Sequence, residues 1–185
     1  MRTVAAMTTT FAEFEANAPE IGAFVRKKIE TTGLAMVGTT RGDGWPRVSA
    51  WELFITDGRI YVGSMPNAVK VKDLRRDPRC CVMTPLADKD DLEGEGKLFC
   101  VAREISTREE HERVRQAFKE VRDFDMGEYD GSGHVFEMAV EGGAFQRVVG
   151  DPSSDSSAFR TTSWNPRDGL RERSRTGALG ESVEL

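Results

Sequence analysis

The stretch GDGWPRVSAWELFITDGRIYVGSMPNAVKVKDLRRDPR, residues 42–79, decides the fold. It holds two strand-like runs, 47–56 and 59–64, which are joined by Asp57-Gly58. In the first run polar and apolar residues partly alternate, as expected of a strand with one buried face. Asp-Gly favours a tight turn, because glycine adopts positive φ without strain and aspartate tolerates it. The stretch therefore predicts a β-hairpin followed by a short helix.

The short helix after the hairpin is basic. The helix and the residues after it hold only two acids among five cations, which are Lys70, Lys72, Arg75, Arg76 and Arg79. A phosphate group binds cationic donors and the free amides of a helix N-terminus. A hairpin that ends in small residues beside these lysines therefore predicts a site for a phosphorylated ligand. A solvated helix face is the alternative interpretation of the same charges.

Composition limits the classes of protein to consider. A chain of 185 residues is long enough for one domain with a real core. The net charge of −5 argues against general nucleic-acid binding. No apolar stretch approaches the length of a membrane span, so neither a span nor a signal peptide is expected. Cys80, Cys81 and Cys100 lie in apolar runs without Cys-x-x-Cys spacing, which predicts buried, reduced thiols in a cytoplasmic protein.

The rest of the chain predicts short strands with flanking helices. Thr10 and Glu13 fit a capping box, Pro19 divides the following apolar stripe into two helices, and Gly33 ends it. A capped helix is predicted at 107–123. Further strands are predicted at 34–39, 79–84, 97–105 and 159–164, and a hairpin at 134–140 and 144–149. Without βαβ alternation, this order favours an antiparallel barrel.

No catalytic constellation is visible in the sequence. Of the two histidines, His111 lies beside three glutamates and is predicted to be solvated, and His134 is predicted to be structural. A Gly-x-Ser-x-Gly elbow, a P-loop and metal-ligand spacing are all missing from the sequence. We therefore assign no catalytic or metal-binding residue, and expect any chemistry to come from a bound cofactor.

The order of several motifs resembles a known family. Gly44-Trp-Pro-Arg-Val-Ser49, Asp57-Gly-Arg-Ile-Tyr-Val-Gly-Ser64, Lys70-x-x-Asp-Leu74 and Arg76-Asp-Pro-Arg79 are similar to the flavin-binding split-barrel family related to pyridoxamine 5′-phosphate oxidase. That family includes flavin-mononucleotide (FMN) enzymes and deazaflavin-dependent reductases. The resemblance implies a mainly β fold, a six-stranded antiparallel Greek-key split barrel. It also implies a homodimer with cofactor sites in the groove between subunits.

The resemblance covers residues 10–173. Residues 1–9 are expected to be a flexible lead-in, and residues 174–185 a flexible tail. FMN is the implied cofactor and a deazaflavin coenzyme the alternative. The implied cofactor-binding residues are Arg47, Val48, Ser49 and Trp51 along the ring, Ser64 and Met65 at the ribityl chain, and Lys70 and Lys72 at the phosphate. The resemblance also implies that Trp164 and Arg167 of the tail approach a cofactor, either that of the same subunit or that of the partner subunit. For Trp51, a core or dimer-interface position is the alternative.

One departure from the family pattern bears on function. Many FMN-binding relatives carry Ser-Arg-Lys where this chain has Ala68-Val69-Lys70. Fewer groups hold the phosphate, or the cofactor differs, or cofactor binding has been lost. Two functions therefore stay open. One is a flavin-type oxidoreductase that transfers hydride to or from a small organic substrate. The other is a non-catalytic protein that binds or stores a flavin, a deazaflavin or a haem-type ligand.

Overall fold

A computed structural model describes residues 8–65, 67–86, 93–130, 134–150, 158–176 and 182–184 of the chain. In this part of the chain the helices are α1 (Phe11–Asn17), α2 (Pro19–Thr32), α3 (Val69–Arg76) and α4 (Arg108–Arg122). The strands are β1 (Leu34–Thr40), β2 (Pro46–Thr56), β3 (Arg59–Gly63), β4 (Arg79–Met83), β5 (Glu95–Glu104), β6 (Val135–Val149), β7 (Ala158–Asn165), β8 (Gly169–Thr176) and β9 (Ser182–Glu184).

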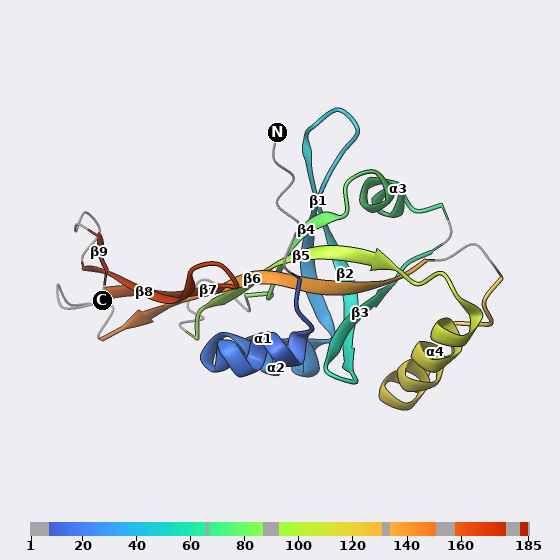
Figure 1. Ribbon diagram of the computed structural model, residues 1–185, viewed down its shortest axis with the longest axis horizontal. Helices are drawn as coiled ribbons and strands as arrows, with labels where there is room; N and C mark the ends of the chain where they lie inside the picture. Colours follow the sequence, from blue (N-terminus) through green and yellow to red (C-terminus); the bar gives the residue numbers. More distant parts are fainter. Residues whose placement is uncertain are drawn as a thin grey trace.

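The first six strands form a closed barrel. They are hydrogen-bonded in the order β3-β2-β1-β4-β5-β6, and a further pairing of β3 with β6 closes the ring. Every pairing is antiparallel. The predicted mainly β, six-stranded antiparallel barrel is therefore confirmed. In Figure 1, α1 and α2 lie on one side of the barrel, α3 on the opposite side, and α4 at one end.

The ends of the first hairpin and of the helices follow the sequence closely. Asp57 and Gly58 have φ angles of 49° and 67°, as the Asp-Gly turn predicts. The capping box is also confirmed, since the Thr10 amide donates to the Glu13 carboxylate at 2.7 Å and the Glu13 amide donates to Thr10 Oγ1 at 3.2 Å. No helix in the described part of the chain is long and apolar enough to cross a membrane.

Two apolar clusters flank the same strands. The larger one fills the barrel and extends under α1 and α2, where Phe14 and Ile21 are completely buried. The smaller one packs α4 against the barrel wall and contains Phe54 and Phe118, whose ring centroids lie 4.9 Å apart. Because Leu53 faces the first cluster and Phe54 the second, β2 is buried on both faces here. This explains why its polar–apolar alternation is only partial.

The predicted cysteine burial is confirmed for two of the three thiols. Cys80 and Cys100 are buried and face each other across the β4–β5 pairing. Cys81 is only half-buried, and burial raises the pKa of its thiol. All three are free thiols.

The hairpin predicted around Gly142-Gly143 is wrong, because β6 runs without interruption from Val135 to Val149. Both glycines are needed for close packing rather than for a turn. A Cβ atom on Gly143 would lie 2.6 Å from the Phe14 ring and 2.9 Å from the Lys97 carbonyl oxygen. A Cβ atom on Gly142 would lie 2.8 Å from the Trp164 carbonyl oxygen.

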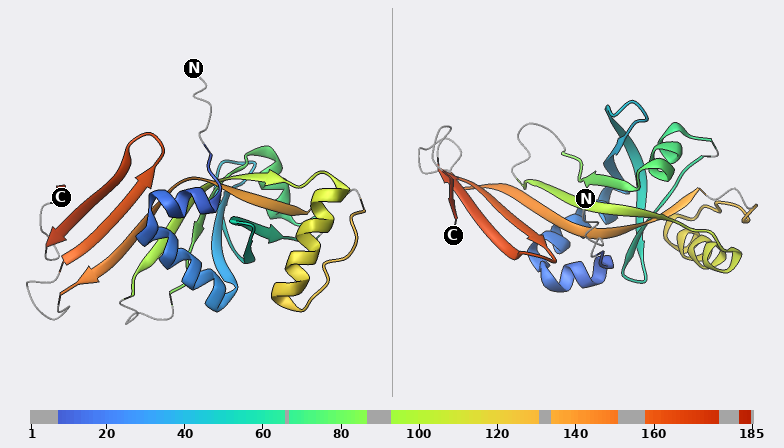
Figure 2. Two further views of the ribbon diagram at one scale, coloured as in Figure 1. Left: turned by 60° about the horizontal axis from the view of Figure 1, so that its bottom comes forward. Right: turned by 45° about the horizontal axis from the view of Figure 1, so that its top comes forward.

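The far half of β6 leaves the barrel and carries β7, β8 and β9 as an extended sheet (Figures 1 and 2). The domain boundary predicted at residue 173 falls within β8, whose pairing continues to Thr176. At the other end, Thr9 pairs with Val140, while residues 1–7 of the predicted lead-in lie outside the described residues.

We predict that Gly143→Ala lowers the free energy of unfolding by about 1–3 kcal/mol, because the new methyl group overlaps a buried ring and a strand carbonyl. Gly63→Ala is the matched control. Gly63 also lies in a strand but has open space at its Cβ position, so its replacement should change stability by less than about 1 kcal/mol. Urea unfolding of both variants measures the difference. Equal stability of the two variants would contradict the packing role of Gly143.

Candidate functional site

A buried carboxylate fixes α3 against the barrel. Asp73 is 2% exposed and accepts hydrogen bonds from Arg47 Nε of β2 at 2.6 Å and from Thr39 Oγ1 of β1 at 3.2 Å. Arg76 of the same helix adds an ion pair to Asp73 at 3.4 Å. Burial raises the pKa of Asp73, but the hydrogen bonds from Arg47 and Thr39 outweigh burial and leave the pKa below its ordinary value. The carboxylate therefore stays charged and holds α3 in place.

This docking brings Lys70 onto the ring of Trp51. The Lys70 ammonium lies 4.3 Å from the centroid of the Trp51 ring, which is itself buried. Burial lowers the pKa of Lys70. Within the described part of the chain no carboxylate pairs with Lys70. The Ala68 side chain gives α3 no cap, and the first turn holds no acid. A half-buried cation thus stands beside the start of a helix, and none of the described carboxylates pairs with it.

The other expected residues of the barrel wall lie close to this helix. Val48 is 64% exposed on the outer face of β2, and Ser49 is half-buried. Met65, just before α3, is 80% exposed. Ser64 has a buried hydroxyl oxygen that lacks a hydrogen-bond partner in the described structure. Buried hydroxyl groups normally have a hydrogen-bond partner, so this one is a candidate contact for a ligand.

The two expected tail residues belong to the extended sheet. Trp164 of β7 is buried and packs edge-on against Phe14 of α1 at 5.4 Å. Arg167 is exposed in the turn between β7 and β8, where its amide donates to Asn165 Oδ1 at 3.0 Å. Lys72 is likewise exposed, on α3. The expected cofactor residues that lie close together are therefore those of β2, residues 64–65 and α3, and we call this part of the barrel the expected groove.

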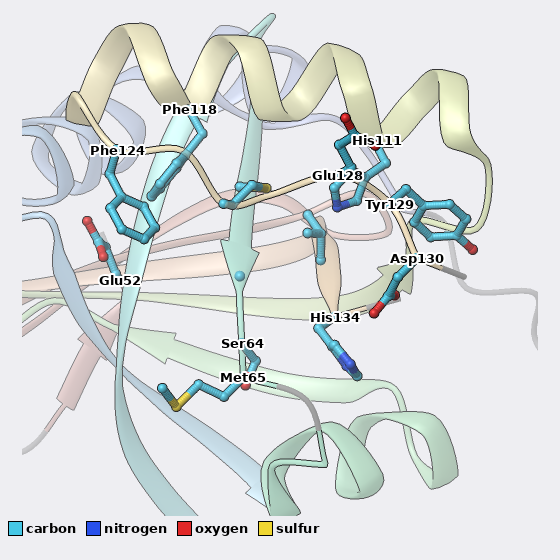
Figure 3. Close-up of a pocket in the computed structure, with 13 residues that line it drawn as sticks. Glu52, Ser64, Met65, His111, Phe118, Phe124, Glu128, Tyr129, Asp130 and His134 are labelled. Atoms are coloured by element: carbon cyan, nitrogen blue, oxygen red, sulfur yellow. The ribbon is translucent and has the colours of Figure 1, made fainter. Parts of the chain in front are cut away.

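A cavity of about 510 Å³ adjoins this groove, and sequence reasoning missed it (Figure 3). It lies between α4, the segment 124–130 and the end of β3. Its lining consists of Glu52, Gly63, Ser64, Met65, His111, Phe118, Phe124, Met126, Glu128, Tyr129, Asp130, His134 and Val135. Ser64 and Met65 belong to both the groove and the cavity, so a ligand in one would lie close to a ligand in the other.

His111 is buried at the wall of this cavity, and the prediction that it is solvated is wrong. It is 7% exposed and packs on the ring of Tyr129, with centroids 5.2 Å apart. Its spacing of three and seven residues from Val114 and Phe118 places all three on the buried face of α4. That spacing was the signal available in the sequence, but the neighbouring glutamates concealed it.

His134, predicted to be structural, joins the two strands that close the barrel. Its carbonyl oxygen accepts a hydrogen bond from the Ser64 amide at 2.8 Å. Its side chain lines the cavity opposite α4 (Figure 3).

Comparison with known proteins identifies the family. The sequence profile of the family described as pyridoxamine 5′-phosphate oxidase matches residues 21–147, which is more than half of the chain. The chain belongs to this family. A search of curated proteins finds no match.

Solved structures share the fold at low sequence identity. A candidate pyridoxamine 5′-phosphate oxidase from Listeria innocua is 17% identical with a TM-score of 0.54, over 66% of this chain and 95% of that one. A candidate 5-nitroimidazole antibiotic resistance protein from Bacteroides thetaiotaomicron is also 17% identical with a TM-score of 0.54, over 65% of this chain and 80% of that one. ChuZ of Campylobacter jejuni is 11% identical with a TM-score of 0.56, over 76% of this chain and 59% of that one. These likenesses show a shared fold.

We predict that Asp73→Asn lowers the free energy of unfolding at neutral pH by about 1–3 kcal/mol, because a charged hydrogen-bond acceptor is lost from a buried site. Since the native pKa of Asp73 lies below the ordinary 3.8, this stabilisation is present above that pH. It is lost as the pH falls through the native pKa. The difference between wild type and variant should therefore shrink in acid.

Denaturant unfolding at neutral and acidic pH measures this difference. Asp43→Asn is the control, because Asp43 pairs with Arg41 at an exposed turn and should contribute less than about 1 kcal/mol. A difference between wild type and Asp73→Asn that does not depend on pH would contradict the role of the Asp73 charge.

Proposed function

We propose that the protein is a flavin-type oxidoreductase that binds FMN and transfers hydride between the flavin and a small organic substrate. The observation that carries this proposal is Lys70. A half-buried lysine on an aromatic ring, with no carboxylate partner in the described structure, fits an anionic group that is brought in by a ligand.

The residues of the groove fit a phosphorylated, flat cofactor. Lys70 would hold the phosphate, together with Lys72 and the uncapped first turn of α3. The unsatisfied hydroxyl of Ser64 would take a hydrogen bond from the ribityl chain or donate one to it. The exposed edge of β2 at Val48 and Ser49 would lie along the ring. A bound flavin would supply the hydride chemistry, and the protein would supply orientation and a dry site.

The groove offers fewer phosphate contacts than the family pattern. Ala68 and Val69 contribute no donor side chain, and Arg47 is already paired with Asp73. Arg76 donates to the Thr40 carbonyl oxygen and pairs with Asp73. We therefore expect Lys70 to carry most of the phosphate binding. A deazaflavin coenzyme is the alternative cofactor. Its anionic tail is longer, so binding it would require further arginines outside this groove.

We propose further that two copies of the chain complete the site. Apolar side chains gather on the outer face of β1, β2, β4 and β5, where register places Met36 beside both Ala50 and Met83. Met36, Val48 and Phe99 are 37%, 64% and 49% exposed on this face. Exposed apolar surface of this kind marks an interaction site. In such a dimer, the extended sheet of the partner subunit would bring Arg167 towards the cofactor.

A non-catalytic protein that binds a flavin, a deazaflavin or a haem-type ligand is the second candidate. The observation that favours it is Ala68-Val69, because these residues remove two of the usual phosphate contacts. Reduction separates the two functions, since an oxidoreductase should pass electrons from NAD(P)H or from a reduced substrate to the bound cofactor. A storage protein should only bind the ligand.

The test is a titration of FMN and of a deazaflavin coenzyme into wild type, Lys70→Ala and Lys27→Ala, followed by fluorescence. Loss of one charge-assisted phosphate contact should weaken binding about 10- to 100-fold in Lys70→Ala. Lys27 of α2 pairs with Glu93, so Lys27→Ala should bind as wild type does. Equal affinity in all three proteins would remove Lys70 from the site. No binding of either cofactor to wild type would overturn the flavin proposal itself.

A further inference from the structure

The cavity beside the groove has a cover that side-chain contacts hold in place. Segment 124–130, which covers it, is pinned near both ends. Arg115 of α4 holds Asp125 through two contacts of 2.6 Å, and this pairing keeps the pKa of Asp125 well below its usual range. The Tyr129 hydroxyl donates to the Ser106 carbonyl oxygen at 3.1 Å. A cavity of this size with a fixed cover suits a small-molecule ligand.

The walls of the cavity are largely aromatic. The Phe118 and Phe124 rings meet nearly at a right angle, with centroids 6.2 Å apart. Tyr129 stands on the other side and packs against His111. Met126, which lies between Phe124 and Tyr129 in the sequence, adds a thioether to the lining. Phe124 is 62% exposed, although a side chain of its size and polarity is normally covered. Such walls favour a flat, apolar ligand body, and their ring faces attract a cation.

The charges at the cavity are all negative. Glu52, Glu128 and Asp130 line it, whereas none of the described lining residues is a lysine or an arginine. Arg122 neutralises Glu52 from outside the lining at 3.2 Å. Figure 3 shows Glu52 and Asp130 on opposite sides of the cavity, so the carboxylate that pairs with Arg122 is separate from the end where Asp130 lies. A phosphate or carboxylate would be repelled here, and an ammonium group attracted.

The buried His111 supplies one polar contact. Its Nδ1 atom is buried and has no hydrogen-bond partner in the described structure, although its side chain lines the cavity. Burial lowers the pKa of His111, so the ring is neutral at neutral pH. A neutral imidazole nitrogen offers either a lone pair or an N–H group. It can therefore bond a polar atom of a ligand without opposing the positive charge of that ligand.

We propose that this cavity binds an aromatic amine, a flat apolar molecule that carries a positive charge and no phosphate. The aromatic body would lie between Phe118, Phe124 and Tyr129, with its ammonium group towards Glu128 and Asp130. This binding site does not depend on a flavin.

The test compares two probes that share a ring but differ in charge: tryptamine, which is an ammonium, and indole-3-propionate, which is a carboxylate. Isothermal titration calorimetry at low ionic strength is run on the full chain without added flavin, because salt screens such contacts. We expect the affinity for tryptamine to exceed the affinity for indole-3-propionate by about tenfold or more. The double variant Glu128→Gln, Asp130→Asn should bring the two affinities within about threefold.

Glu120→Gln is the matched control, since Glu120 is exposed on α4 and does not line the cavity. This variant should keep the preference for the amine. Equal or tighter binding of the carboxylate probe by wild type would overturn the proposal, as would a preference that survives in the double variant. Failure of wild type to bind tryptamine at millimolar concentration would also overturn it. Because no flavin is present, each of these outcomes is separate from the Lys70 titration.

Discussion

The arrangement of the site depends on the pairing of β3 with β6, which closes the barrel. Tyr61, Val62 and Gly63 pair with residues 135–137, and the next amide, that of Ser64, donates to the His134 carbonyl oxygen. At this seam the buried Glu137 pairs with Arg59 of β3 and with Arg103 of β5. Both arginines are partly exposed, so the carboxylate is fully paired while the cations keep some contact with water. Without this seam, Ser64 and Met65 would have no fixed place between the groove and the cavity.

The two halves of the proposed site differ in charge. The groove at α3 presents Lys70 without a carboxylate partner in the described structure, whereas the described lining of the cavity at α4 includes three carboxylates and no cation. Asp73 of the same helix does not pair with Lys70, because its carboxylate points inward to Arg47 and Thr39, where it fixes the helix. Arg115 is likewise paired with Asp125, outside the cavity lining. Charges that hold the framework are thus kept apart from charges that face a ligand.

Local patterns predicted the local structure well. The Asp57-Gly58 turn, the capping box at Thr10 and the helix start at Pro19 depend on neighbouring residues only, and all are confirmed. One error arose where distant residues decide. Gly142 and Gly143 resemble a turn in sequence, but they lie in a strand because Phe14, Lys97 and Trp164 approach them closely. The glutamates beside His111 suggested solvent, although the helical period placed the ring inside. The expected cofactor residues around Lys70 remain predictions.

The cavity could not be predicted, because segment 124–130 has neither a strand nor a helix period. Its position follows from the Arg115–Asp125 pair and the Tyr129 hydroxyl, which the sequence does not connect. The negative charge of the cavity nevertheless restricts which groups of a ligand can bind there. A phosphorylated molecule entering this site would be attracted to Lys70 and repelled by Glu128 and Asp130, so its phosphate belongs in the groove. An amine without phosphate would prefer the cavity. The same chain could thus sort a cofactor from a second ligand by charge alone, with Ser64 and Met65 at the border between them.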